Sequence, residues 1–116
     1  MEHIENLDSL VGLTEDELYV IAGRYVARGR MMATPPEKST LKNFGKSRMR
    51  ELMPEIQSRV CKNERLIEIA KKETDERTLI VSVLDVLSTL ITGGVPLVVI
   101  SALIIKIGLN RLCASS

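Results

Sequence analysis

One long run of apolar residues constrains this chain more than any other feature. Residues 78–105 span 28 positions and contain a single charged side chain, Asp85. The run is interrupted where Gly93 and Gly94 precede Pro96. Glycine after a helix and proline at the start of the next are typical of a turn between two helices. The sequence therefore predicts an apolar helical hairpin.

The two arms of this hairpin are predicted over residues 78–92 and 96–112. Both are apolar on nearly every face, which is typical of helices that span a membrane or lie inside a core. At about 1.5 Å per residue the arms are about 22 and 25 Å long, shorter than a hydrocarbon layer of about 30 Å. We favour two short membrane-spanning helices. The alternatives are a shallow or re-entrant insertion and a hairpin buried in a soluble homo-oligomer.

Each arm also carries an internal charge. In a hairpin that turns near residue 94, Asp85 lies at nearly the same depth as Lys106, so the two could neutralise each other across the hairpin or between subunits. Polar and small residues recur along the arms, and such residues face helix partners rather than lipid. This predicted assembly stripe consists of Ser82, Asp85, Thr89, Thr92, Ser101, Lys106 and Gly108. It predicts self-association, and in a pore-forming version Ser82, Asp85 and Thr89 line the pore.

Charged residues divide the chain into two parts. Residues 1–77 carry 28 of the 31 acidic and basic side chains, and residues 78–116 carry three. We predict a polar helical region over residues 1–77, in the cytosol, and a membrane-associated apolar hairpin over residues 78–116. Basic residues precede the first arm and follow the second, whereas the turn is uncharged. The positive-inside rule then places both termini in the cytoplasm.

Basic residues are concentrated in the segment from residue 24 to residue 50. This segment has eight Lys and Arg side chains and one acid, whereas residues 1–23 have six acids and no Lys or Arg. The predicted basic surface consists of Arg24, Arg28, Arg30, Lys38, Lys42, Lys46, Arg48 and Arg50. We favour a segment that folds back on the acidic N-terminus, with anionic lipid as the next interpretation. Two Tyr, one Phe and no Trp leave few rings for stacking bases, so nucleic acid is the least expected partner.

The polar region is predicted to be helical, which makes the whole chain all-α. Thr14 and Glu17 have the spacing of a capping box, and apolar residues at helical spacing predict a helix over residues 15–31. The prolines at positions 35 and 36 end this helix, and residues 33–46 are predicted to form a basic loop.

A second helix is predicted to begin at Arg48. Pro54 either kinks it or begins a new helix. From Glu55 onward a thin apolar seam recurs at helical spacing, and no helix-breaking residue separates it from the apolar run. One long helix is therefore predicted over residues 55–92, leading into the hairpin.

No group of residues predicts catalytic or metal chemistry. His3 is the only histidine, and no base or ligand lies near it in the sequence. Cys61 and Cys113 are far apart and form no C-x-x-C motif, so we expect free thiols and no zinc site. Residues 45–47 read Gly-Lys-Ser, but a phosphate-binding loop needs a further glycine where Thr40 stands. We expect no enzymatic activity, no cofactor and no metal.

These features predict a small non-enzymatic, membrane-associated interaction protein. It would form a homo-oligomer through the C-terminal hairpin, and its charged helices would contact an unidentified protein partner. The alternative is a soluble all-helical adaptor or scaffold subunit that buries the hairpin in a homo-oligomer.

Overall fold

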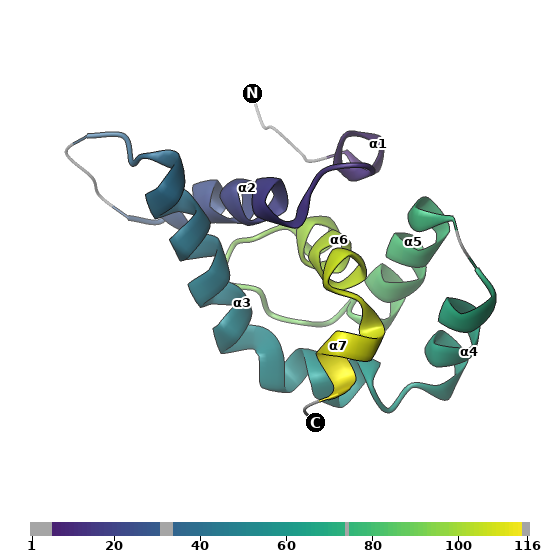
Figure 1. The fold of residues 1–116 in the computed structure, drawn as a ribbon. Helices are drawn as coiled ribbons and strands as arrows, with labels where there is room; N and C mark the ends of the chain where they lie inside the picture. The colour runs from purple at the N-terminus through teal and green to yellow at the C-terminus, as the bar shows by residue number, and fades with distance from the viewer. Residues whose placement is uncertain (1–5, 31–33, 74, 115–116) are drawn as a thin grey trace.

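The computed structural model describes residues 6–30, 34–73 and 75–114, and this part of the chain is all helical (Figure 1). It contains no strand, so the predicted all-α fold is confirmed. A long helix in the first half is followed by shorter C-terminal helices, also as predicted. The helices are α1 (Leu7–Leu10), α2 (Glu15–Arg28), α3 (Lys38–Val60), α4 (Glu64–Lys72), α5 (Glu76–Val86), α6 (Leu97–Ile107) and α7 (Leu109–Ala114).

The second half of the apolar run forms α6, which lies in the middle of the molecule. Figure 1 shows α6 with α2 and α3 on one side and α5 on the other. Residues 99–104 are all buried, and six consecutive buried residues cover every face of a helix. The sequence of α6 is apolar all round because the chain's own helices surround it.

The prediction of two membrane-spanning arms is wrong. Both α5 and α6 have 11 residues, and no helix within the described ranges is long and apolar enough to cross a membrane. The first arm ends as a helix at Val86, where a turn begins, and the second is divided at Gly108, which has a φ of 93°. The predicted placement of the termini depended on spanning arms and loses its basis with them.

The N-terminal hairpin of α2 and α3 is held together by an unusually close approach of two backbones. Gly23 of α2 lies against the backbone of Leu41, and Gly45 of α3 lies against the backbone of Tyr19. A Cβ atom at either glycine would overlap the facing carbonyl oxygen. The two contacts are reciprocal, so each helix contributes one glycine. Gly45 is thus explained by packing, and no phosphate-binding loop is formed there.

The start of α2 is as predicted, but α3 differs from the prediction. Thr14 accepts a hydrogen bond from the Glu17 backbone N–H at 3.1 Å, and Glu17 accepts one from the Thr14 N–H at 2.8 Å. The predicted basic loop over residues 33–46 is wrong, because α3 begins at Lys38. It also continues through Pro54, which is exposed, so water can reach the carbonyl that the proline leaves without a donor.

The long helix predicted over residues 55–92 is wrong as well. Breaks after Val60 and after Lys72 separate α3, α4 and α5. Asn63 caps α4 by accepting from the Leu66 N–H at 2.9 Å, and Asp75 caps α5 by accepting from the Thr78 N–H at 3.1 Å. Two helix-capping residues therefore start new helices where the apolar spacing alone predicted continuity.

A disulfide joins Cys61, which follows α3, to Cys113 in α7. The prediction of free thiols is therefore wrong. The bond links positions 52 residues apart and attaches the last helix to the end of the longest one. Gln57 supports the same junction, because its side-chain amide donates to the Leu112 carbonyl at 2.8 Å.

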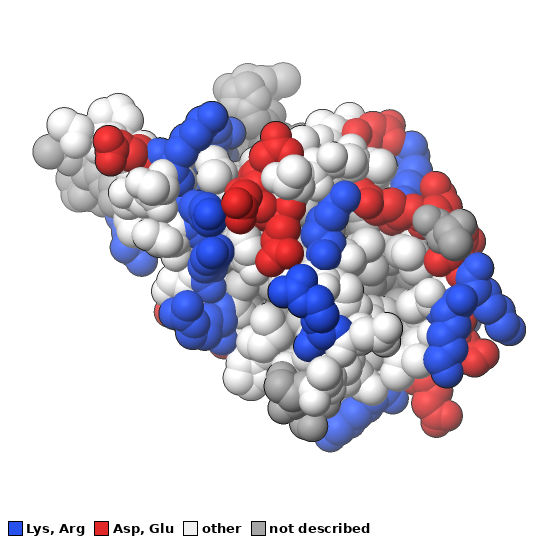
Figure 2. Space-filling view, in the orientation of Figure 1, with Lys and Arg blue, Asp and Glu red and all other residues white. Residues whose placement is uncertain are grey.

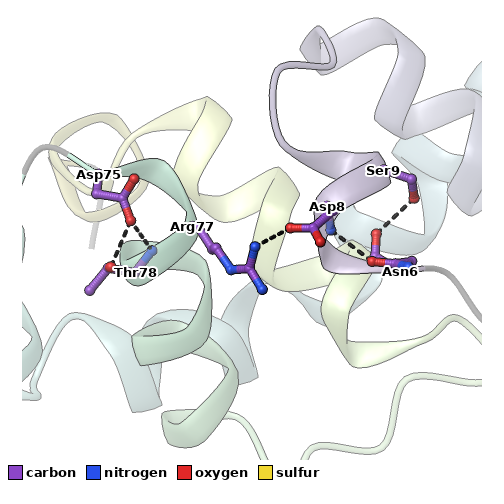
Figure 3. A network of polar contacts seen from close by, with 6 residues as sticks. All are labelled: Asn6, Asp8, Ser9, Asp75, Arg77 and Thr78. Carbon is purple, nitrogen blue, oxygen red and sulfur yellow. Dashed lines mark hydrogen bonds and ion pairs between the residues drawn. The ribbon is translucent and has the colours of Figure 1, made fainter.

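The first turn of α5 connects three parts of the molecule. Figure 3 shows Asp75 accepting hydrogen bonds at the start of α5, and Arg77 extended toward Asp8 of α1, with which it forms an ion pair. Between them in sequence, Glu76 accepts from the Gly12 N–H at 2.9 Å and from Lys106 Nζ of α6 at 2.7 Å. The residues around Glu76 thus hold α1, α5 and α6 together.

Burial of the Glu76 carboxyl opposes its ionisation, but the hydrogen bonds from Lys106 and Gly12 outweigh burial, so the net effect is a lowered pKa. A carboxyl whose pKa is lower in the folded chain than in the unfolded one stabilises the fold above its unfolded pKa. This stabilisation is lost as the pH falls through its folded pKa. Glu76 therefore contributes at neutral pH, and its contribution declines once the pH falls below the ordinary glutamate pKa of about 4.3.

Glu76→Gln is expected to lower the free energy of unfolding by about 1 to 2 kcal/mol at pH 7, because Lys106 loses its partner. The difference from the wild type should shrink as the pH falls and disappear below the folded pKa of Glu76, where the wild-type side chain is also neutral. Urea unfolding at several pH values measures this. Glu68→Gln, which removes an exposed pair with Lys72, is the control and should have little effect. A pH-independent difference would contradict the role of charge.

Candidate functional site: a cationic surface on α2 and α3

The eight residues of the predicted basic surface lie on the α2–α3 hairpin. Figure 2 shows Lys and Arg side chains in a column over α3 and the end of α2, beside acidic side chains over the start of α2. Two of the eight are engaged inside the fold. Lys42 Nζ lies 3.2 Å from Asp16 Oδ2, and Arg48 pairs with Glu51 and donates to carbonyls of the α5–α6 loop.

The other six basic side chains are all exposed. None of them forms an ion pair with an acid in the described parts of the chain. We call these six the cationic surface. It consists of Arg24, Arg28, Arg30, Lys38, Lys46 and Arg50.

Three members of the cationic surface lie over aromatic rings. The guanidinium of Arg28 is 4.5 Å from the Tyr25 ring centroid, and that of Arg30 is 4.5 Å from the Phe44 centroid. The third is Lys46, whose Nζ lies 5.7 Å from the Tyr19 centroid. A ring beneath a cation restricts the side chain without neutralising its charge. The rings therefore hold these cations in position while leaving them available to an anion.

Acidic residues at the start of α2 border the cationic surface. The backbone hydrogen bond from Thr14 lowers the pKa of Glu17, so this carboxyl is firmly ionised at neutral pH. A surface hollow of about 360 Å³ is lined by charges of both signs, from Asp16 and Glu17 and from Arg24 and Lys38. The predicted folding of the basic segment back on the acidic N-terminus is found at Lys42, whereas the other six cations form no ion pair with an acid within the described ranges.

The predicted pairing of Asp85 with Lys106 is wrong. Lys106 binds Glu76, at the other end of α5, and Asp85 is exposed. Asp85 was expected beside Lys106 because the first arm was predicted to be one helix that continues to residue 92. The helix ends at Val86 instead, and its first turn lies beside the end of α6.

The remaining residues of the predicted assembly stripe do not form one continuous surface. Ser82 donates to the Thr78 carbonyl of its own helix, and Ser101 is fully buried, with no hydrogen-bond partner for its hydroxyl. Thr89 accepts from Arg59 Nη1 at 2.6 Å, and the Thr92 hydroxyl donates to the Val95 carbonyl. Gly108 supplies the positive φ between α6 and α7. Several of the polar residues that were expected to face other copies thus make contacts inside the chain.

Sequence reasoning missed the residues that hold the α5–α6 loop. Arg48 and Arg59 of α3 both donate to this loop, and Ile91 projects from it. The sequence signal that could have indicated this loop was an isoleucine two residues before a pair of glycines. His3 lies outside the described residues. No cluster of three His, Cys, Asp or Glu side chains suited to a metal ion occurs within the described ranges.

Fold and surface together define an all-α protein whose N-terminal helical hairpin contributes to the apolar core and displays six exposed cations, three of them held over aromatic rings. No known protein family, curated protein sequence or solved structure matches the chain significantly.

Proposed function

We propose that this protein is a non-catalytic helical adaptor that binds an acidic segment of a partner protein through its cationic surface. The observation that carries the proposal is the set of six exposed basic residues that form no ion pair in the described part of the chain, three of them held over rings. Arginine forms four of the six, and its planar guanidinium suits the carboxylate pairs of protein interfaces.

The charge arrangement favours a short acidic segment over an extended polyanion. A DNA backbone or an anionic membrane presents negative charge over a wide area, so it would also meet the acids at the start of α2. Those acids, Asp16 and Glu17, would repel it. The chain has a pI of about 7.8, below the value above 9 typical of nucleic-acid-binding domains. All three aromatic rings lie under cations, which leaves none open for base stacking.

Neutralising two cations of α3 tests the proposal. Lys38→Gln with Arg50→Gln removes two exposed charges that contact no ring, so the fold should be unaffected. We expect binding of a fluorescent oligoglutamate peptide, measured by anisotropy at about 0.15 M salt, to weaken about tenfold. Lys62→Gln with Arg65→Gln removes one lysine and one arginine near α4, and this matched control should bind as the wild type does.

The same assay includes a DNA duplex and phosphatidylserine vesicles as competing anions. Preferential binding of the peptide, lost only in the α3 variant, supports the adaptor. Equal weakening in both double variants, no binding of the peptide by the wild type, or tighter binding of the duplex or the vesicles would overturn it.

A further inference from the structure

The most exposed large apolar side chain in the described parts of the chain is Ile91, in the loop between α5 and α6. It is 86% exposed, compared with 42% for Val81, the next most exposed. Gly93 and Gly94, which follow in the same loop, are exposed and have no side chains to cover it. Single exposed apolar residues are common on protein surfaces. Ile91 differs because the loop that carries it is fixed by specific bonds.

Two arginines of α3 hold this loop in place. Arg48 Nη1 donates to the carbonyls of Thr92 and Gly93 at 3.0 and 2.6 Å. On the other side of Ile91, Arg59 Nη1 donates to the Thr89 hydroxyl at 2.6 Å. The isoleucine is therefore held outward between two anchored points before any partner arrives. A projection fixed in this way loses little conformational entropy on binding.

An apolar pocket lies at the opposite end of the α5–α6 hairpin. Its volume is about 450 Å³, and its apolar walls come from α4, the first turn of α5, the end of α6 and α7. These wall residues are Ile67, Ala70, Leu79, Ile105 and Leu109. A hollow of this size and lining is typical of a site that receives an apolar group. It is large enough for an isoleucine side chain.

We infer that copies of this chain associate head to tail, with Ile91 of one copy inserted into this pocket of the next. Ile91 and the pocket are at opposite ends of one hairpin, so the same copy cannot satisfy both. The charges around them are complementary. Arg48 and Arg59 are turned toward the loop and are 21% and 29% exposed, whereas the side chains of their partners are 66% exposed at Glu51 and 56% at Glu55. The charges that face solvent near the loop are therefore mainly acidic, and the exposed Lys71 lines the pocket.

A contact between two different surfaces of the same chain is heterologous. Such contacts produce rings or open chains rather than symmetric dimers. The cationic surface takes no part in it, so each added copy would repeat that surface along the assembly. Repetition strengthens binding to a partner with several acidic segments. Self-association itself does not depend on the proposed adaptor function.

Sedimentation velocity of the full chain over about 10 to 500 µM tests the inference. We expect the sedimentation coefficient of the wild type to rise with concentration. Ile91→Gln removes the projection, and Ala70→Gln places a polar chain in the pocket, so each should weaken association at least tenfold. Val81→Gln replaces another exposed apolar residue and should associate as the wild type does. Circular dichroism verifies that each variant is folded.

Mixing the two defective variants distinguishes head-to-tail association from any symmetric contact. The Ala70→Gln chain keeps its isoleucine and the Ile91→Gln chain keeps its pocket, so an equimolar mixture should form heterodimers and nothing larger. A wild type that stays monomeric to about 500 µM, an Ile91→Gln variant that associates normally, or a mixture that remains monomeric would each overturn the inference. Oligoglutamate binding by the Ile91→Gln variant tests the adaptor function separately.

Discussion

Gly23→Ala and Gly45→Ala are each expected to lower the free energy of unfolding by about 3 kcal/mol or more. Alanine normally stabilises a helix relative to glycine by about 1 kcal/mol, so the expected sign is opposite to that of helix propensity. The reason is that the added methyl group would overlap backbone atoms of the facing helix. No side-chain rotation relieves such an overlap, and α2 and α3 must separate.

Urea unfolding followed by circular dichroism measures this loss, and Gly29→Ala is the matched control. Gly29 follows α2 with a negative φ, and a Cβ atom there would lie 3.5 Å from the Val26 carbonyl, an ordinary contact. Its replacement should change stability by less than about 0.5 kcal/mol. If Gly23→Ala behaved like Gly29→Ala, the close approach of the two helices would not be required for stability.

Removing the disulfide is expected to have an effect of similar size. For a loop of 52 residues, the chain-entropy relation gives about 4 kcal/mol of stabilisation through restriction of the unfolded chain. Cys61→Ser with Cys113→Ser should lose this amount. α7 should be affected first, since it has six residues and depends on the bond for its attachment.

The measurement compares urea unfolding of the wild type and the double variant with and without dithiothreitol. The reductant should destabilise the wild type to the level of the variant and leave the variant unchanged. A wild type that is equally stable with and without the reductant would contradict a stabilising role for the bond.

Local signals in the sequence were sufficient for several elements of the fold. The capping box of Thr14 and Glu17 requires only contacts within one turn, and it correctly predicted the start of α2. The glycines and the proline of residues 93–96 likewise predicted the turn before α6. Asn63 and Asp75 are local capping signals as well, for the starts of α4 and α5. The apolar spacing nevertheless predicted one continuous helix across both positions.

The environment of the apolar run was not determined by local signals. A helix that is apolar on every face satisfies a membrane and a protein interior equally well, and the choice depends on what surrounds it. Here α6 is surrounded by α1, α2, α5 and α7 of the same chain. The pairing of Lys106 with Glu76 and the disulfide are long-range in the same sense, because they follow from how the helices are arranged.

The sequence identified the basic residues of the candidate site but not which of them are available to a partner. Composition alone identified the eight basic residues, because charge does not depend on packing. Packing determines which of these residues are available to a partner. Lys42 forms an ion pair with Asp16, Arg48 donates to a loop carbonyl, and the guanidinium of Arg28 lies over a ring. Such differences arise from tertiary contacts and have no signature in the local sequence.

The bond between Cys61 and Cys113 also determines how the molecule responds to mechanical load. Tension applied to the two ends of the chain would pass from the end of α3 directly to α7 through the covalent link. The helices α4, α5 and α6 lie within the closed loop, so they would carry none of that load. About 180 Å of chain contour would remain unextended under a force that unravels α2 and α3.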